Sequence, residues 1–133
     1  MEYFKNCPIC KKKLSWKRIE DRKRLKCTGC GWINYLNPLP AVACLAVDKT
    51  GAVLMIKRAV GPQIGRWALP SGFIELEETP QEAALRELKE ETGLEGKVEN
   101  LIGVYRQVSN YYGAVLTIGY RIKITGGKLE PGD

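Results

Sequence analysis

The chain has 133 residues, of which 44% are hydrophobic and 27% are charged, values typical of a globular protein rather than a disordered or fibrous one. It contains no histidine, which excludes a Ser–His–Asp triad, a Cys–His dyad and a zinc site with histidine ligands. Residues 1–37 hold ten Lys/Arg and three Asp/Glu, a formal charge of +7, whereas residues 38–133 hold eleven and twelve, a formal charge of −1, so the charge distribution predicts two modules.

The first module carries two Cys-x-x-Cys pairs separated by sixteen residues: Cys7, Cys10, Cys27 and Cys30. This spacing is typical of a zinc site with four cysteine ligands. The residues between the pairs include too few large apolar side chains for a core, so a metal ion would supply the missing stability. We therefore predict a small four-cysteine zinc ribbon with structural Zn²⁺ over residues 1–37; a redox role for the two pairs is the alternative.

The segment between the two cysteine pairs reads as a short hairpin with nine basic side chains: Lys11, Lys12, Lys13, Lys17, Arg18, Arg22, Lys23, Arg24 and Lys26. Together with Trp16 and Trp32, on which a base can stack, these side chains suggest weak contact with nucleic acid. The alternative is that the cations are simply solvated, as on many small cysteine-rich modules.

The second module begins after the proline-rich linker at residues 37–40 and predicts one helix among four strands. The predicted order is strand, strand, helix, strand, strand, over residues 41–47, 52–57, 80–92, 101–107 and 114–124. The first two strands would form a hairpin, and residues 61–72 would form a long loop. This order predicts an α/β (α+β) fold with a mixed sheet and a helix on one face, and Cys44 is expected to be a buried strand residue.

The helix has clear start and stop signals in the sequence. Thr79 is the expected N-cap, Pro80 the first helical residue, and Glu82 completes a capping box with Thr79. Gly93 is the expected C-terminal stop.

Three carboxylates, Glu87, Glu90 and Glu91, recur at i, i+3 and i+4 on this helix and therefore share one face. Like charges one turn apart destabilise a helix, and a divalent cation relieves that repulsion. Oxygen donors of this kind suit Mg²⁺ or Mn²⁺. Arg86, four residues before Glu90, can orient that carboxylate. The alternative is a solvated acidic helix face without a metal.

The segment from Gly72 to Leu94, GFIELEETPQEAALRELKEETGL, resembles the signature of the Nudix hydrolases. The family pattern is G-x5-E-x7-R-E-U-x-E-E-x-G-U, in which U is aliphatic. Every fixed position is filled: Gly72, Glu78, Arg86, Glu87, Leu88, Glu90, Glu91, Gly93 and Leu94. The preceding W-A-L-P-S-G from Trp67 is similar to the family's W-x-L-P-G-G, with Ser71 in place of a glycine.

The resemblance implies a Nudix α/β/α sandwich with a mixed sheet over residues 38–133. A cysteine ribbon ahead of such a domain is similar to NADH pyrophosphatases and related nucleotide hydrolases. The family continues past a G-G-x-L-x-P-G-D turn into a further strand and helix, whereas this sequence reaches Asp133 within that turn. We therefore expect the domain to lack that strand and helix.

The resemblance also implies Mg²⁺-dependent cleavage of the pyrophosphate in a nucleoside diphosphate linked to another group. Carried over to this sequence, Glu87, Glu90 and Glu91 would bind Mg²⁺ (or Mn²⁺) with the backbone carbonyl of Gly72. Arg86 would orient the glutamates as part of the catalytic set, and Glu78 would act structurally near the start of the helix. The expected substrate contacts are Arg58, Trp67, Tyr111 and Tyr112.

ADP-ribose or an NAD(H)-like dinucleotide is the first expected substrate class. A (deoxy)nucleoside triphosphate or a dinucleoside polyphosphate is the alternative, and a catalytically silent module that binds a nucleotide or nucleic acid is an alternative of another class. The family's NADH pyrophosphatases carry S-Q-P-W-P-F-P-x-S after the signature, and residues 95–123 do not match it. We further expect a cytoplasmic protein without a membrane span, and a homodimer on the resemblance alone.

Overall fold

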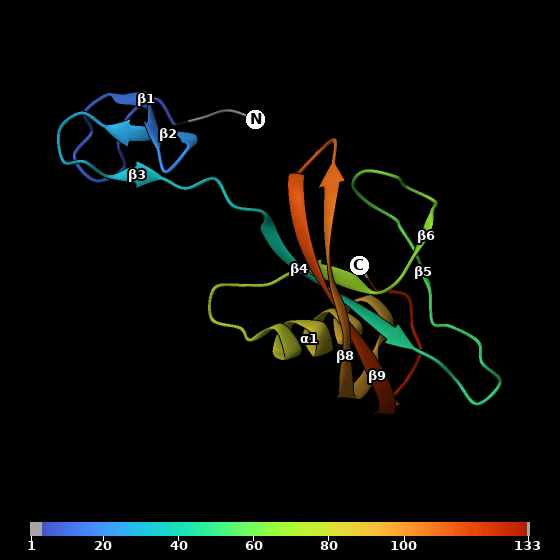
Figure 1. The fold of residues 1–133 in the computed structure, drawn as a ribbon. Coiled ribbons are helices and arrows are strands. Elements are labelled where there is room, and N and C mark those ends of the chain that lie inside the picture. The colour runs from blue at the N-terminus through green and yellow to red at the C-terminus, as the bar shows by residue number, and fades with distance from the viewer. Residues whose placement is uncertain (1–3, 133) are drawn as a thin grey trace. The chain divides into compact units, whose positions relative to one another are not determined.

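The computed structural model describes residues 4–132, and the chain divides into two compact units, residues 1–37 and 38–133. Each unit contains its own β-sheet, and the single helix of the described residues belongs to the second unit (Figure 1). The boundary between the units falls after Asn37.

The first unit is a three-stranded antiparallel sheet of β1 (Leu14–Ile19), β2 (Arg22–Cys27) and β3 (Ile33–Asn34), with β2 in the centre. The predicted basic hairpin is confirmed as β1 and β2, which pair along their whole length. Glu20 and Asp21 connect the two strands at φ values of 48° and 62°. Two residues at positive φ match the right-handed twist of a tight hairpin, which explains the short connection.

The second unit contains a four-stranded mixed sheet in the order β7-β4-β9-β8. Its strands are β4 (Leu39–Ala46), β7 (Ser71–Phe73), β8 (Leu94–Ser109) and β9 (Gly113–Gly127). The pair β4–β9 is parallel, and the other two pairs are antiparallel. The predicted mixed sheet is therefore confirmed.

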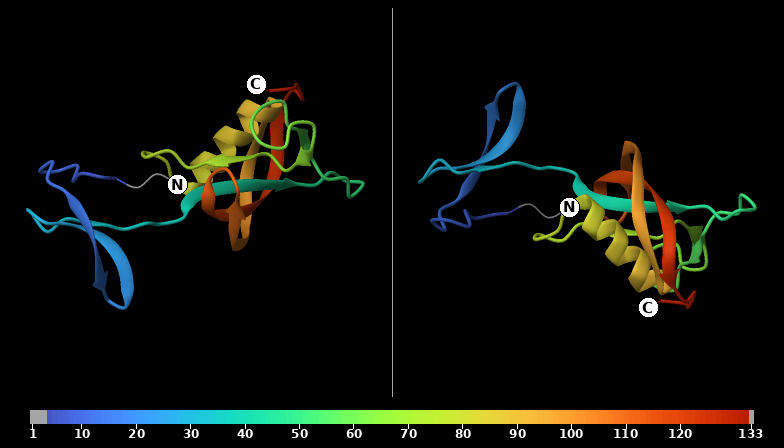
Figure 2. Two further views of the ribbon diagram at one scale, coloured as in Figure 1. Left: turned by 90° about the horizontal axis from the view of Figure 1, so that it is seen from above. Right: turned by 90° about the horizontal axis from the view of Figure 1, so that it is seen from below.

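Helix α1 (Pro80–Thr92) lies to one side of the sheet formed by β4, β8 and β9, as both views of Figure 2 show. Its apolar side chains, Leu88 among them, join the core with buried residues of β4 and β9. Cys44 is fully buried in this core, as predicted, and its thiol donates a hydrogen bond to the carbonyl of Ala84. No helix within residues 4–132 combines the length and the apolar character that a bilayer crossing requires.

The ends of α1 are those that the sequence predicts. The Thr79 hydroxyl accepts a hydrogen bond from the Glu82 amide at 3.3 Å, and the Glu82 carboxylate accepts one from the Thr79 amide at 2.8 Å. Gly93 ends the helix at φ 73°, a left-handed conformation that glycine adopts without steric cost.

The predicted strand 52–57 and its hairpin with residues 41–47 are largely wrong. Val47 and Val53 form one isolated bridge, and the regular strand β5 is only Ile56–Lys57. Its partner is β6 (Trp67–Ala68), which lies inside the predicted loop 61–72 together with β7. The run from Ala52 to Ile56 is apolar without alternation, so its sequence does not specify which segment it pairs with.

Strands β8 and β9 are longer than the predicted strands 101–107 and 114–124. The sequence underestimates β8, because the alternation of side chains along it is interrupted. The pairing register shifts at three places, between Glu95 and Gly96, between Val98 and Asn100, and between Leu101 and Gly103. Each shift moves the following side chains to the other face, so the two-residue period that marks a strand disappears from the sequence.

We expect the Thr79→Ala substitution to destabilise the second unit by about 1 kcal/mol, because it removes the hydroxyl that caps α1. The measurement is urea unfolding followed by far-ultraviolet circular dichroism. The matched control is Thr79→Ser, which keeps the hydroxyl and should retain most of the stability. Equal losses for the two variants would contradict the role given to the cap.

Candidate active site and metal centre

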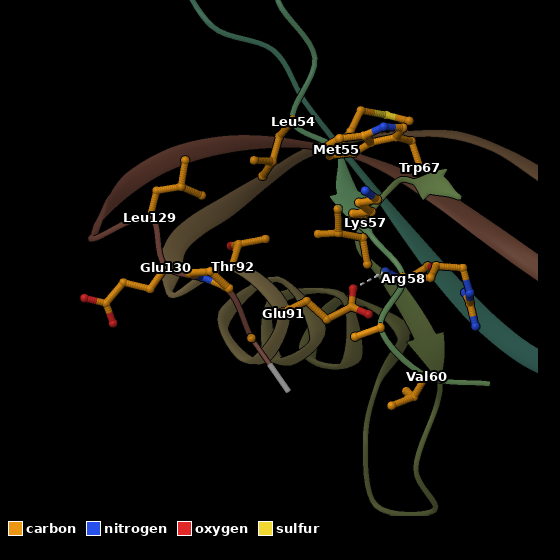
Figure 3. A pocket seen from close by; sticks show the side chains of 15 residues that line it. Leu54, Met55, Lys57, Arg58, Val60, Trp67, Glu91, Thr92, Leu129 and Glu130 are labelled. Carbon is orange, nitrogen blue, oxygen red and sulfur yellow. Dashed lines mark hydrogen bonds between the residues drawn. The ribbon is translucent and has the colours of Figure 1, made fainter. Parts of the chain in front are cut away.

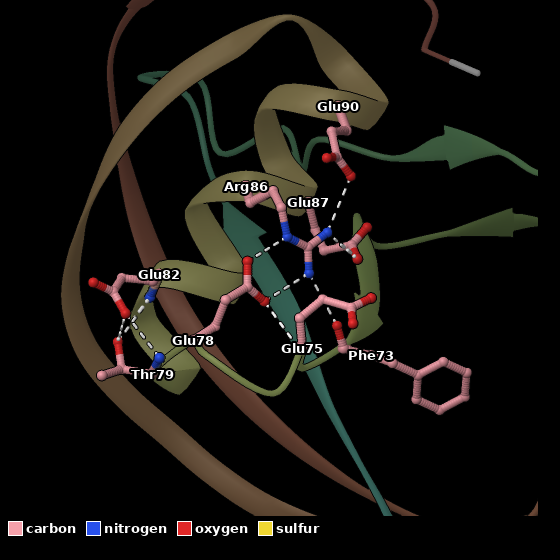
Figure 4. Close-up of polar contacts among 8 residues, drawn as sticks. All are labelled: Phe73, Glu75, Glu78, Thr79, Glu82, Arg86, Glu87 and Glu90. Carbon is pink, nitrogen blue, oxygen red and sulfur yellow. Dashed lines mark hydrogen bonds and ion pairs between the residues drawn. The ribbon is translucent and has the colours of Figure 1, made fainter.

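The residues Glu87, Glu90 and Glu91 are called the acidic face of α1 below. Arg86 links the segment before the helix to this face (Figure 4). Its guanidinium donates to the Glu78 carboxylate at 2.9 Å and to the backbone carbonyl of Phe73 at 3.0 Å. It also forms ion pairs with Glu87 at 2.7 Å and with Glu90 at 3.0 Å. With only 27% of its side chain exposed, Arg86 is held in one position by three carboxylates and one carbonyl.

Glu78 fixes the loop that precedes the helix. Its carboxylate accepts hydrogen bonds from Arg86 and from the backbone amide of Glu75, the latter at 3.0 Å. Because both donors favour the ionised form, they lower the pKa of Glu78 from its ordinary value of 4.5 to about 2. The carboxylate is therefore charged at neutral pH and available to hold Arg86.

Gly72 lies in β7 directly against the Glu87 side chain. A Cβ atom at residue 72 would overlap the Glu87 carboxylate group. The absence of a side chain at this position therefore allows the backbone of β7 to approach the acidic face of α1 closely.

Glu91 lies one turn after Glu87 and accepts a hydrogen bond from the backbone amide of Ser71 at 2.8 Å. Partial burial raises the pKa of Glu91, the Ser71 amide opposes that effect, and the negative charge of Glu87 reinforces it. Two segments that are distant in sequence, β7 and the C-terminal half of α1, therefore meet at this carboxylate.

The three predicted metal-binding glutamates differ in their surroundings. Glu87 and Glu90 are paired with Arg86, whereas Glu91 is held by β7. Among residues 4–132, the group whose ligand atoms already converge as a metal site requires is the four cysteines, not these glutamates. The donor set of carboxylates beside an open glycine backbone nevertheless fits a hard divalent cation.

A pocket of about 560 Å³ opens next to Glu91 (Figure 3). Apolar side chains line much of it: Leu54, Met55, Val60, Trp67 and Leu129. Lys57, Arg58 and Glu130 also line it. The pocket therefore combines an apolar wall, which suits the flat face of a base, with charged groups near the acidic face of α1.

The structure brings two of the four predicted substrate contacts, Arg58 and Trp67, into this pocket. Arg58 also donates from Nε to the Pro62 carbonyl at 3.0 Å, which braces the loop between β5 and β6. The other two, Tyr111 and Tyr112, are not among the residues that line it. Tyr112 packs edge-on against Phe73 of β7, with ring centroids 5.1 Å apart, and against Tyr111 at 4.7 Å.

Most of the apolar wall is not predicted from the sequence. The sequence pattern places Leu54, Met55 and Val60 in a strand or a loop without a role, and Leu129 in a turn-rich tail. The signal that remains in the sequence is the uninterrupted apolar run 52–56, which is too long for an exposed turn.

The four cysteines of the first unit converge on one point. The sulfurs of Cys7 and Cys30 are 3.7 Å apart, those of Cys10 and Cys27 are 3.3 Å apart, and all four lie within 4.8 Å of one another. A tetrahedral ion with bonds of about 2.3 Å places its sulfurs about 3.8 Å apart, so these residues fit a small zinc ribbon.

Within the second cysteine pair, backbone amides favour the thiolate of Cys27, whereas burial and the neighbouring thiols raise the pKa of Cys30 to about 11. The sulfur of Cys27 accepts hydrogen bonds from the backbone amides of Cys30 at 3.4 Å and Gly29 at 3.3 Å. These amides lower the pKa of the Cys27 thiol to about 6. Since the thiolate is the form that binds metal, the turn itself favours coordination.

Comparison with known families gives one match over most of the chain. The sequence model described as the NUDIX domain matches residues 37–133, which include the whole second unit and the acidic face of α1.

Individual relatives agree with this match. The chain is 44% identical over 100 residues to an ADP-ribose pyrophosphatase of Methanocaldococcus jannaschii, covering 74% of this chain and 59% of that protein. It is 38% identical over 87 residues to a MutT-like protein of Streptomyces ambofaciens, covering 65% of this chain and 53% of that protein. The chain thus spans somewhat more than half the length of these two relatives.

Among solved structures, the crystal structure of a NUDIX hydrolase from Nitrosomonas europaea superimposes with a TM-score of 0.80 at 31% identity. The superposition covers 97% of this chain and 72% of that one.

We expect the Glu78→Gln substitution to reduce stability at neutral pH and to flatten the acid dependence of unfolding. The pKa of Glu78 is depressed in the folded state, so its contribution is present above pH 4.5 and is lost as the pH falls toward about 2. The measurement is urea unfolding at several pH values across that window.

The matched control is Glu77→Gln, one residue away in the same loop. Within residues 4–132, Glu77 makes no ion pair or side-chain hydrogen bond, so this variant should keep the acid dependence of the parent. An acid dependence that is the same in the Glu78→Gln variant and the parent would contradict the role of the Glu78–Arg86 pair.

Proposed function

Because the chain belongs to the NUDIX domain family, we propose that it is a pyrophosphohydrolase that cleaves a phosphoric anhydride bond in a nucleotide. One observation carries this proposal. Glu91 is part of the acidic face of α1 and at the same time lines the 560 Å³ pocket. A substrate in that pocket would have its phosphates beside the carboxylates.

The residues proposed to hold Mg²⁺ or Mn²⁺ are Glu87, Glu90 and Glu91, with the backbone carbonyl of Gly72. When bound, such an ion neutralises charge on a diphosphate and lowers the pKa of the attacking water. Three supports come from the chain: the carboxylates share one helix face, Gly72 leaves room beside Glu87, and the Ser71 amide fixes Glu91.

The remaining groups of the site would orient the reactants. Arg86 holds Glu87 and Glu90 through its guanidinium, and Glu78 keeps Arg86 in place. A glutamate of the acidic face would accept the proton of the attacking water, since the chain has no histidine that could do so. Fixing these side chains before substrate arrives lowers the cost of orienting them in the transition state.

ADP-ribose is the proposed substrate. The relative of Methanocaldococcus jannaschii at 44% identity is named as an ADP-ribose pyrophosphatase. The pocket suits such a molecule, because the Trp67 ring and the apolar wall can receive an adenosine while Arg58 and the carboxylates lie near its diphosphate. Hydrolysis would release AMP and ribose 5-phosphate.

For the first unit we propose a structural Zn²⁺ bound by the four cysteines. The converging sulfurs and the amide hydrogen bonds to Cys27 support it. A four-thiolate site leaves no open position for a substrate, so the ion would stabilise the ribbon rather than catalyse.

We expect the Glu91→Gln substitution to lower kcat roughly a hundredfold or more with the fold intact, because it removes one carboxylate charge from the site. The measurement is turnover with Mg²⁺ of ADP-ribose, NADH, diadenosine polyphosphates, and normal and oxidised nucleoside triphosphates, with the products identified. The matched control is Glu99→Gln on β8, whose carboxylate pairs with Arg121 on the surface and should leave the rate unchanged.

AMP released from ADP-ribose by the parent and lost in the Glu91→Gln variant would support both the reaction and the site. A wild-type rate in that variant would contradict the site. Cleavage of another member of the panel in preference to ADP-ribose would replace the substrate and leave the reaction class standing.

We expect about one zinc ion per chain in the purified protein, and much less in a Cys27→Ser variant. Elemental analysis after extensive dialysis measures this content. The matched control is Cys44→Ala, which removes a cysteine that lies in the core of the second unit and should retain the zinc. Zinc content that is the same in the Cys27→Ser variant and the parent would contradict the assigned ligands.

A further inference from the structure

One face of the ribbon sheet carries four cations in close register. On the central strand β2, Leu25 and Cys27 are buried, so the alternate residues Arg22, Arg24 and Lys26 project to the other face. Lys17 of β1 lies directly opposite Arg24 and therefore projects to the same face. These four residues, Lys17, Arg22, Arg24 and Lys26, are called the basic face below.

Within residues 4–132, no acidic side chain pairs with the basic face. Neither β1 nor β2 contains an Asp or Glu, and no ion pair within residues 4–132 involves any of the four cations. Arg22, Arg24 and Lys26 follow one another at two-residue intervals, about 7 Å apart along an extended strand. The result is a straight row of positive charge with a fourth cation beside its middle.

The same face leaves polar groups unsatisfied. Arg24 Nε and Ser15 Oγ are both buried and have no hydrogen-bond partner among residues 4–132, and Ser15 lies opposite Lys26 on this face. Lys17 and Arg24, like charges directly across a strand pair, repel one another. A bound anion would relieve this repulsion between the two cations.

The surface also offers a hollow and an aromatic ring. A hollow of about 370 Å³ is lined by Ser15, Lys17 and Lys26, among others. The Arg24 guanidinium carbon lies 4.6 Å from the centre of the Tyr35 ring, and Tyr35 is still 53% exposed. A row of cations beside a partly open aromatic ring suits a chain of phosphates that carries flat bases.

We propose that the basic face binds single-stranded nucleic acid without sequence preference, with the phosphates along β2 and a base against Tyr35. The half-exposed Tyr35 ring beside the row of cations favours a single strand, whose unpaired bases can stack on it, over a duplex, whose bases already stack on one another. An acidic peptide would satisfy the cations but has no use for the ring. This inference does not rest on the proposed hydrolysis.

The test uses the full zinc-loaded chain and a fluorescent oligonucleotide of about 16 nucleotides with a 5′-hydroxyl end, followed by anisotropy at low salt without Mg²⁺. We expect log K to fall with log salt with a slope of about −3, for four phosphate contacts. The K17Q/R24Q double variant should bind about tenfold more weakly, with a slope smaller in magnitude by about 1.4.

The matched control is K97Q/K123Q, which also removes two cations that face each other across an exposed strand pair, here β8 and β9. It should bind like the parent. In a second series, Tyr35→Leu should weaken binding about fivefold or more, whereas Tyr35→Phe should not. Zinc content equal to that of the parent shows in each variant that the ribbon is intact.

Five results would overturn the proposal, and the first four concern affinity and competition. The first is no binding at low salt, and the second is equal weakening by the two double variants. The third is displacement of the labelled oligonucleotide by ADP-ribose. The fourth is displacement by polyglutamate that is as effective as displacement by an unlabelled oligonucleotide at the same concentration of charge. Binding that survives Tyr35→Leu unchanged would likewise overturn it, because the surface would then recognise charge alone. ADP-ribose separates this site from the pocket of the second unit.

Discussion

The arrangement of the candidate active site depends on the guanidinium of Arg86. It joins Glu78 and the Phe73 carbonyl, which belong to the segment before α1, to Glu87 and Glu90 on the helix itself. Without this cation, the carboxylates of Glu87, Glu90 and Glu91 would repel one another with less compensation. They also lie in the C-terminal half of α1, where the helix dipole disfavours negative charge. The acidic face therefore persists because a partly buried positive charge lies beside its members.

The elements that could be predicted from the sequence are those whose signals are local. The ends of α1 follow from Thr79, Glu82 and Gly93, since caps depend only on residues within one turn. The convergence of the four cysteines follows from their spacing, because a Cys-x-x-Cys turn directs both sulfurs to one point. The contact between Arg86 and Glu90 follows from helical periodicity.

The features that could not be predicted depend on pairing between distant segments. Residues 52–57 are mostly apolar, so nothing local shows that Ile56 pairs with Ala68 rather than with β4. The apolar wall of the pocket is built from this same segment and from Leu129, far apart in sequence. Tyr111 and Tyr112 suggest a substrate contact by position, whereas the fold directs Tyr112 to Phe73.

The two units of the chain differ in what stabilises them, and this difference affects how the chain unfolds. The second unit has an apolar core of its own, whereas the buried residues of the first are few and include Cys7 and Cys27. With the proposed zinc ion bound, the first unit would depend on its metal, and a metal-dependent module beside an apolar one departs from all-or-none unfolding. A single melting temperature would then not describe the whole chain, because each unit would have its own and only that of the ribbon would vary with the concentration of free zinc.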